Sequence, residues 1–345
     1  MQIFVTMIGG MLPGKKLTIE VEQAWTVQKL IDAIDEAEVL NRGTKTGAAN
    51  AANIADFSRD RGWLDGRFRF AEIAGEGNMN LTLRIVTDAD SIVLKQSVPY
   101  VAKYPNIPAP IDRDRVEAAF YQSLKGMPMA AVMPIFIGHA PEYHLLAFED
   151  LGPASDCTDI YSDVALDSDI PELLSWLRDL HQLHIESNVF TNRDMRMLNH
   201  AHIFEIPFED HGSNDLTLRA KELGDLYLSD GPTLLHGDFY PGSWLRTTQG
   251  VRVIDPEFAF AGAAEFDLGV FAAHLVFAGL DDAAIRAAFD HYQPANPFDL
   301  RLALGFAGVE VLRRLWGIAT LPLPENRGDQ DLVWIDWATA HVLDV

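Results

Sequence analysis

The chain has 345 residues, of which 48% are hydrophobic and 10% aromatic. This composition excludes a disordered chain, and the length exceeds what one compact core usually holds, so we expect two domains or lobes. With 27 Lys and Arg against 50 Asp and Glu the net charge is −23, which disfavours binding to nucleic acid or to an anionic membrane.

Residues 1–50 are expected to form an N-terminal extension. Two strand-like runs, Gln2–Met7 and Leu17–Val21, flank a glycine-rich turn, and Thr26 precedes an amphipathic run that predicts a capped helix. About forty residues of this segment resemble the start of ubiquitin-like β-grasp proteins. The extension is therefore either a docked hairpin plus helix or a degenerate β-grasp module, and Asn41–Asn53 predicts a linker.

Residues 51–150 have the pattern of a small, mostly antiparallel sheet with one helix. The predicted elements are strands at Phe68–Ile73, Leu81–Val86, Ser91–Gln96, Ala131–Phe136 and His144–Phe148, and a helix at Pro110–Leu124. In residues 151–345 the apolar period becomes helical, except in one short hairpin. A small antiparallel β lobe followed by a large, mainly helical lobe is an α+β arrangement typical of the protein-kinase-like two-lobe fold.

A soluble, cytoplasmic protein is expected. The N-terminus lacks the basic flank of a secretory signal, and the longest nearly apolar run, Leu268–Leu280, is too short to span a bilayer. The single cysteine, Cys157, excludes an intrachain disulfide and a cysteine-cluster metal site.

Two acidic motifs flank a short apolar strand in the helical half. Asp238 ends the motif His-Gly-Asp, and Asp255, 17 residues later, begins Asp-Pro-Glu after the strand Val251–Ile254. An enzyme that transfers the γ-phosphoryl group of ATP to an alcohol needs one carboxylate to accept the alcohol proton and another to hold Mg²⁺. We therefore predict that Asp238 is the base, that Asp255 and Glu257 bind Mg²⁺, and that His236 braces the loop.

The antiparallel half and the segment after it supply the candidate nucleotide ligands, which are Gly75, Gly77, Asn78, Lys95, Glu117, Glu149 and Leu151. The first three lie in a turn between two predicted strands, where backbone N–H groups can approach phosphates closely. Lys95 ends an apolar strand one hairpin later, where it is predicted to bind the phosphates with Glu117 as its ion-pair partner. Glu149 and Leu151 mark the expected connector between lobes, whose backbone holds the adenine.

Arg313 and Arg314 interrupt an otherwise apolar helix. A buried charge must find a partner or remain costly, and two interpretations follow. The arginines form an internal salt bridge with an acid such as Asp267, or they bind the substrate and its phosphate. We favour the second interpretation, and we expect Asp267 to cap the following helix and to hydrogen-bond the loop of Asp238.

Five stretches resemble, in order, the aminoglycoside phosphotransferase and choline kinase superfamily, and most closely its methylthioribose kinase branch. They are GEGNMNLTLR (75–84), LKQSVPYVAKYP (94–105), IDRDRVEAAFY (111–121), HGDFYPGS (236–243) and IDPEFAF (254–260). The resemblance covers about residues 55–320. It implies ATP and Mg²⁺ as cofactors, the roles given above for Asp238, Asp255, Glu257 and Lys95, and a homodimer. Ser243 stands where the wider superfamily usually has a metal-binding Asn, and methylthioribose kinases have a similar pair of arginines.

Three functions stay open at this point. The favoured one is a kinase of a sugar-like alcohol such as 5-methylthioribose, and the second keeps the fold with an aminoglycoside or choline-like acceptor. The third is a nucleotide-binding pseudokinase that recruits a protein partner through residues 1–50. Because Lys95 and the three acidic residues are all present, the third is disfavoured. The helical half is shorter than the resemblance implies, so Glu205–Asn214 is expected to be a remodelled substrate loop.

Overall fold

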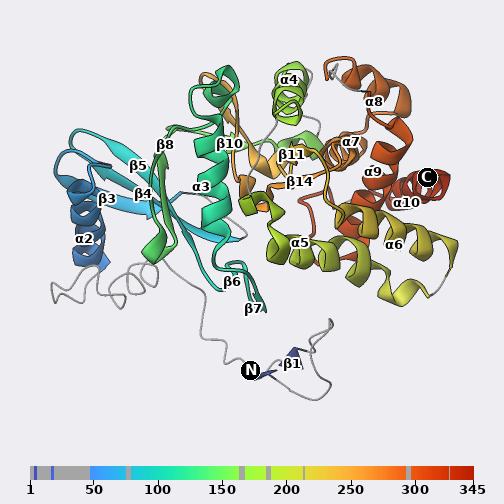
Figure 1. The fold of residues 1–345 in the computed structure, drawn as a ribbon, viewed down its shortest axis with the longest axis horizontal. Helices are drawn as coiled ribbons and strands as arrows, with labels where there is room; N and C mark the ends of the chain where they lie inside the picture. Colours follow the sequence, from blue (N-terminus) through green and yellow to red (C-terminus); the bar gives the residue numbers. More distant parts are fainter. Residues whose placement is uncertain are drawn as a thin grey trace. The chain divides into compact units, whose positions relative to one another are not determined.

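The computed structural model describes residues 4–5, 17–18, 47–74, 79–162, 168–183, 188–212, 214–292, 297–325 and 327–345. The chain forms two compact units. Unit 1 comprises Met1–Arg115 and Phe136–Asp150, and unit 2 comprises Val116–Ile135 and Leu151–Val345 (Figure 1). Residues 116–135, which the sequence-based boundary placed in the small lobe, thus group with the helical unit. None of the described helices is long and apolar enough to cross a membrane.

Unit 1 is built on a five-stranded antiparallel sheet, as the sequence predicted. Its strands are β3 (Phe68–Ile73), β4 (Asn80–Thr87), β5 (Ser91–Ser97), β9 (Leu145–Glu149) and β8 (Phe136–Ala140), in that spatial order. Two further pairs are β6 (Tyr100–Val101) with β7 (Tyr104–Pro108), and β1 (Phe4–Val5) with β2 (Leu17–Thr18). The β1–β2 pair lies within the two predicted N-terminal strands, whereas the helix predicted after Thr26 lies outside the described residues.

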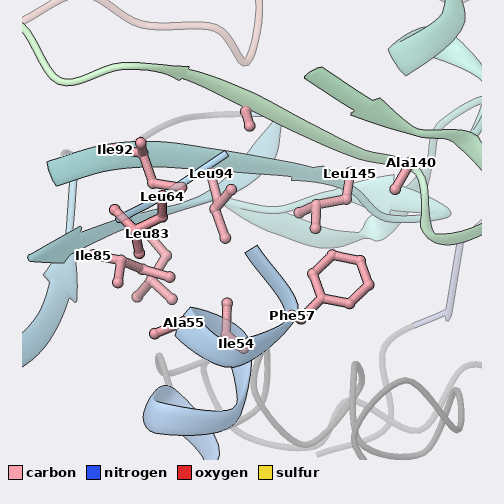
Figure 2. Close-up of a cluster of buried hydrophobic side chains, with 11 residues drawn as sticks. Ile54, Ala55, Phe57, Leu64, Leu83, Ile85, Ile92, Leu94, Ala140 and Leu145 are labelled. Atoms are coloured by element: carbon pink, nitrogen blue, oxygen red, sulfur yellow. The ribbon is translucent and has the colours of Figure 1, made fainter. Parts of the chain in front are cut away.

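The predicted linker Asn41–Asn53 is wrong in its second half, because α2 spans Gly47–Asp60. Alanine is the best helix former, and this segment contains several. The helix then places Ile54 and Phe57, which are 0% and 6% exposed, against the sheet (Figure 2). Its partners are alternate residues of three strands, namely Leu83, Ile85, Ile92, Leu94, Leu145 and Ala147. Helix α2 thus covers one face of the sheet. The strand residues that contact it alternate along each strand, because successive side chains of a strand point to opposite faces.

The strand predicted at Ala131–Phe136 is also wrong. Pro128 begins a 3-10 helix over Pro128–Val132, and the strand β8 starts only at Phe136. Proline has no N–H for a sheet ladder, so Pro134 delays the strand. The helix predicted at Pro110–Leu124 is α3, Arg113–Leu124, which crosses from unit 1 into unit 2.

Unit 2 is mainly helical. Its helices are α4 (Ile170–His181), α5 (Arg193–His200), α6 (Asp215–Tyr227), α7 (Glu265–Phe277), α8 (Asp282–Phe289), α9 (Leu300–Trp316) and α10 (Gln330–Asp344). Its strands are β10 (Ser155–Asp156), β11 (Thr233–Leu235), β12 (Trp244–Thr247), β13 (Gly250–Val253) and β14 (Phe260–Gly262). The predicted substrate loop Glu205–Asn214 contains a 3-10 helix, Ile206–His211, which follows a π-helical turn at Ala201–Glu205.

Helices α7 and α9 pack along each other and form the frame of unit 2 (Figure 1). Their close approach depends on Gly269, because a Cβ there would lie 2.5 Å from Cβ of Phe306 and 2.7 Å from the carbonyl oxygen of Ala303. On its other side α9 packs against α10, where a Cβ at Gly308 would lie 2.5 Å from the carbonyl oxygen of Ala338. Glycines therefore set the spacing of these helices.

The packing of α2 can be tested with Ile54→Ala. Removing a fully buried isoleucine side chain is expected to destabilise unit 1 by about 2–5 kcal/mol, measured by urea unfolding. Ile73→Ala is the matched control, because Ile73 is 55% exposed and its loss should cost less than about 0.5 kcal/mol. Equal effects of the two substitutions would show that α2 does not pack on the sheet.

Candidate active site

The two acidic motifs lie at the ends of paired strands in unit 2. Strand β11 leads into the motif at 236–238, and it pairs with β14, which follows the motif at 255–257. Between the motifs β12 and β13 form a hairpin, with Trp244 opposite Val253. Both motifs directly follow strands of this small region. The strand pairing therefore brings the two motifs close together in space, as their spacing in the sequence indicated.

The loop of Asp238 is held by hydrogen bonds from within its own region. The ring of buried His236 has its Nε2 2.9 Å from the carbonyl oxygen of Ile254, and the N–H of Asp238 donates to Nδ1 at 3.3 Å. These contacts select the tautomer in which Nε2 donates and Nδ1 accepts. The hydroxyl of Ser243 donates to the carbonyl of Asp238 at 2.9 Å. His236 and Ser243 therefore fix the backbone on both sides of the acidic residue.

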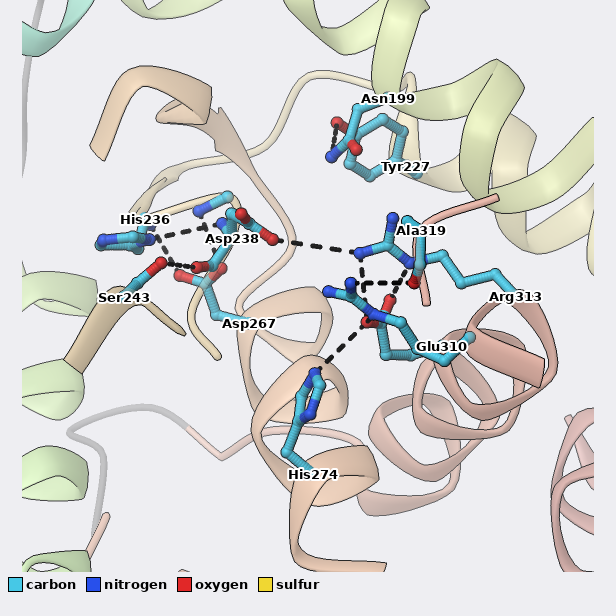
Figure 3. Close-up of polar contacts among 12 residues, drawn as sticks. Asn199, Tyr227, His236, Asp238, Ser243, Asp267, His274, Glu310, Arg313 and Ala319 are labelled. Atoms are coloured by element: carbon cyan, nitrogen blue, oxygen red, sulfur yellow. Dashed lines mark hydrogen bonds and ion pairs between the residues drawn. The ribbon is translucent and has the colours of Figure 1, made fainter. Parts of the chain in front are cut away.

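Asp267 holds the same loop from the first turn of α7. Its fully buried carboxylate accepts the N–H of His236 at 2.7 Å and that of Gly237 at 2.9 Å (Figure 3). Nε2 of His181 lies 3.2 Å from the same carboxylate, and Nδ1 of His181 is 2.7 Å from the hydroxyl of Tyr292. The predicted contact of Asp267 with the loop is confirmed. The predicted helix cap is wrong, since the residue before the helix is Ala264.

Asp238 itself has an environment suited to proton transfer. Its side chain is 24% exposed, and its Oδ1 is 3.9 Å from Nη2 of Arg313. Burial raises the pKa of its carboxyl to about 6, while Arg314 and Arg313 oppose the rise. A carboxyl that titrates near neutral pH can both take up and release a proton under physiological conditions.

The two arginines share one buried acid, and it is Glu310, not the suggested Asp267. Arg313 donates from Nε at 2.5 Å and from Nη2 at 3.1 Å, and Nε of Arg314 donates at 2.7 Å (Figure 3). Glu310 is 1% exposed, and the arginines are 5% and 8% exposed. Residues three and four apart lie on one face of a helix, so all three charges converge although adjacent arginines diverge.

The Asp-Pro-Glu motif presents oxygen ligands at a strained turn. Asp255 adopts the left-handed conformation with φ 63° and ψ 47°, and Pro256–Phe258 form a short 3-10 turn. Nδ2 of Asn192 donates to the carbonyls of Glu257 and Ala259 at 3.0 Å each, which braces this turn. Non-glycine residues in this backbone region cost energy and cluster at functional sites.

The donor set of this turn fits magnesium. Two carboxylates two residues apart supply hard oxygens, and Mg²⁺ in phosphoryl-transfer sites usually takes one or two carboxylates together with phosphates and water. Among the described residues, one group of three acidic or histidine side chains has its ligand atoms close enough together to bind an ion. It consists of Asp112, Asp114 and His144 of unit 1. Asp255 and Glu257 thus offer an open set rather than a closed cage.

The predicted nucleotide ligands are divided between the units. Lys95 lies on the central strand β5, opposite Thr82 and Leu146, and it is 5% exposed. It follows Leu94, so its side chain points to the face of the sheet that α2 does not cover. Glu149 ends β9 in unit 1, whereas Glu117 of α3, 2% exposed, and Leu151 belong to unit 2. The ion pair of Lys95 with Glu117 stays a prediction, and Gly75, Gly77 and Asn78 lie outside the described residues.

Several contributors to this site were not found from the sequence. Glu310 precedes the arginines by three and four residues, and that helical spacing was a usable signal. Asn192 is 65 residues from Glu257, and His181 is 86 residues from Asp267. No local pattern announces such contacts, because they depend on tertiary packing.

Comparisons with known proteins identify the family of the chain. The sequence profile of the phosphotransferase enzyme family (APH) matches residues 71–303. Methylthioribose kinase of Exiguobacterium sibiricum is 28% identical over 326 residues, which covers 75% of this chain and 82% of that protein. Methylthioribose kinase of Bacillus velezensis is 26% identical over 320 residues, covering 71% and 77%.

Solved structures show the same fold. Choline kinase LicA from Streptococcus pneumoniae aligns with a TM-score of 0.54 and 15% identity, over 84% of this chain and 98% of that one. Choline kinase from Cryptosporidium parvum aligns with a TM-score of 0.50 and 13% identity, over 84% and 93%. The chain therefore has the kinase-like α+β fold that the sequence predicted, and it belongs to the phosphotransferase enzyme family. It is a small-molecule kinase, a phosphotransferase with an alcohol group as acceptor.

The geometry of the loop can be tested at Gly237. Its φ is +82°, and a Cβ would lie 2.2 Å from the carbonyl oxygen of Phe258. Gly237→Ala must therefore move backbone next to Asp238, and a displacement of about 1 Å is expected to lower kcat on the order of 100-fold. Gly279→Ala is the control, since its φ is +86° but nothing lies within 4 Å of the new Cβ. A coupled ADP assay measures both variants, and equal kcat values would contradict the role of the loop.

Proposed function

We propose that this kinase transfers the γ-phosphoryl group of ATP to a hydroxyl of a neutral, sugar-like acceptor, with 5-methylthioribose as the first candidate. The observation that carries the proposal is the placement of Asp238. Its carboxyl is held by a braced loop, has a pKa raised to about 6, and lies beside two arginines that already share one acid. The curated relatives named methylthioribose kinase support the choice of acceptor.

In the proposed mechanism Asp238 accepts a hydrogen bond from the acceptor hydroxyl. As the oxygen–phosphorus bond forms, the hydroxyl proton passes to the carboxylate and is later released to solvent. ATP supplies the phosphoryl group, the bond from its γ-phosphorus to the bridging oxygen breaks, and ADP leaves. Asp255 and Glu257 would hold Mg²⁺, which would neutralise charge on the phosphates. Lys95 is proposed to hold the nucleotide phosphates, and the arginine pair is proposed to orient the acceptor.

The arginines beside Asp238 bear on the charge of the acceptor. Arg313 and Arg314 carry two positive charges, which Glu310 and the ionised Asp238 balance with two negative charges. A choline-like or aminoglycoside cation placed against the guanidinium groups would meet like charges at short range in a partly buried site, which costs free energy. A neutral acceptor meets no such cost, so it is the proposed one.

The base can be tested by its pH dependence. Only the ionised carboxylate accepts a proton, so kcat/KM should be flat above pH 6 and fall about tenfold per pH unit below it. Asp238→Asn should lower kcat by about 10²–10⁴ and remove this acid limb. Rates are read from ADP release between pH 5 and 8, with circular dichroism at each pH to confirm the fold. An Asp238→Asn variant that keeps both the rate and the acid limb would assign the titration to another group.

The acceptor class can be tested with a panel of four compounds. Steady-state kcat/KM is measured for 5-methylthioribose, ribose, choline and an aminoglycoside under the same ATP and Mg²⁺ concentrations. We expect the neutral sugars to exceed the cationic compounds by at least tenfold, about the effect of one unfavourable charge contact. A cationic acceptor with the highest kcat/KM would overturn the proposed acceptor class while leaving the kinase assignment in place.

A further inference from the structure

A second buried group of polar residues lies behind the arginine pair. The hydroxyl of Tyr161 is 2.6 Å from Nδ1 of His274, and Nε2 of His274 is 3.4 Å from Oε1 of Glu310 (Figure 3). The last contact does not have the geometry of a hydrogen bond, so it is a polar contact between the ring and the carboxylate. Tyr161 is 5% exposed, His274 0% and Glu310 1%. We call these three residues the arginine-side triad.

The environment of the triad determines which of its groups carry protons. Burial raises the pKa of Tyr161 well above its usual range, so its O–H stays protonated and donates to Nδ1. Burial lowers the pKa of His274 to about 4, which leaves the ring neutral. Burial opposes ionisation of Glu310, but Arg313 and Arg314 hold its pKa well below the ordinary value. The neutral ring therefore carries its proton on Nε2, which faces the carboxylate of Glu310 at 3.4 Å without the geometry of a hydrogen bond.

The triad reaches the site through the same carboxylate that binds the arginines. Glu310 accepts from both guanidinium groups, and Arg313 is in turn 3.9 Å from Asp238. The guanidinium of Arg314 lies 4.8 Å from the centre of the Tyr240 ring and donates to the carbonyl of Ala319 at 3.2 Å. The charged or titratable groups facing His274 are thus Tyr161, Tyr240, Glu310, Arg313 and Arg314.

We propose that Tyr161 and His274 are positioning residues that hold Glu310, and through it Arg313 and Arg314, in the acceptor-binding arrangement beside Asp238. This proposal rests on the proposed function of Asp238. The ion pairs of the described residues join Arg313 to Glu310 and to Asp238, so without a held Glu310 the guanidinium could close the 3.9 Å gap and form an ion pair with the base. That ion pair would occupy the place of the acceptor and stabilise the charged carboxylate.

Unit 2 contains a second triad of a tyrosine, a histidine and a carboxylate, with Asp in place of Glu, that serves as an internal comparison. Tyr292, His181 and Asp267 form the loop-side triad, with distances of 2.7 Å and 3.2 Å along it. Its carboxylate binds backbone N–H groups of the Asp238 loop rather than arginines. Each tyrosine is buried, and each loses one hydroxyl on substitution by phenylalanine. Tyr161→Phe and Tyr292→Phe are therefore matched changes that act on different parts of the site.

The experiment compares kcat, the KM for the acceptor, the KM for ATP and the pH profile of these variants. Tyr161→Phe should raise the acceptor KM about 2- to 10-fold, the range for a lost hydrogen bond, and leave the KM for ATP unchanged. Its acid limb should move to lower pH, because Arg313 then stabilises the Asp238 carboxylate more strongly. Tyr292→Phe should lower kcat instead, since it loosens the loop that carries the base.

A rescue series separates positioning from a merely structural role. His274→Phe should raise the acceptor KM more than Tyr161→Phe, and His274→Gln, which keeps an N–H donor, should recover part of the loss. Thermal unfolding is recorded for each variant. Destabilisation in all variants with unchanged acceptor KM and unchanged acid limb would show that the triad only supports the fold, and would overturn the proposal.

The result for Asp238→Asn distinguishes a failure of the positioning role from a failure of the proposed function. If that variant is inactive while Tyr161→Phe and Tyr292→Phe give the same kinetic pattern, the positioning role fails and the proposed function stands. If Asp238→Asn keeps full activity, the assignment of the base fails, and the positioning role fails with it. A raised acceptor KM confined to the arginine-side variants, with an inactive Asp238→Asn, supports both.

Discussion

The two hydrogen bonds from backbone N–H groups to the carboxylate of Asp267 are the contacts on which the site depends. They attach the loop of Asp238 to the first turn of α7, and α7 packs on α9 with the spacing that Gly269 permits. Helix α9 carries Glu310 and the two arginines. The loop of Asp238 is thus bound to α7, and Glu310 and the two arginines belong to α9. The packing of these two helices therefore sets the distance between the base and the charged groups beside it.

Three carboxyl groups in this region have different partners, and the partners determine what each can do. Asp267 binds backbone N–H groups, and Glu310 binds two guanidinium groups. The described ion pair of Asp238 is a 3.9 Å contact with Arg313, so desolvation outweighs the attraction of the arginines and raises the pKa of Asp238 to about 6. Of Glu310 and Asp238, the first is held ionised well below neutral pH and the second titrates close to it. Desolvation alone would raise the pKa of both carboxyl groups. The two pKa values differ because the number and the distance of the nearby positive charges differ.

Much of the fold and part of the site could be predicted from the sequence. The alternation of apolar residues located four of the five sheet strands, and the acidic motifs located the hairpin of the site. The helix α2 was missed because small and polar residues conceal a helix whose stability comes from burying Ile54 and Phe57. From the sequence, Asp267 was one example of an acid that could pair with the arginines, whereas the structure pairs them with Glu310, whose helical spacing was available. Contacts such as Asn192 with Glu257 join residues far apart in the chain, and no local pattern contains them.

The neutral histidine of the arginine-side triad has a consequence for the acceptor. A neutral imidazole accepts with one nitrogen and carries its proton on the other, so His274 lies between Tyr161 and Glu310 without adding a charge. A lysine or arginine in the place of His274 would add a third positive charge to the group formed by Glu310, Arg313 and Arg314. A second acid there would hold Arg313 away from the acceptor. The neutral histidine leaves this group with a net charge of +1, which the ionised Asp238 balances, and such a balanced site suits a hydroxyl-rich, uncharged acceptor.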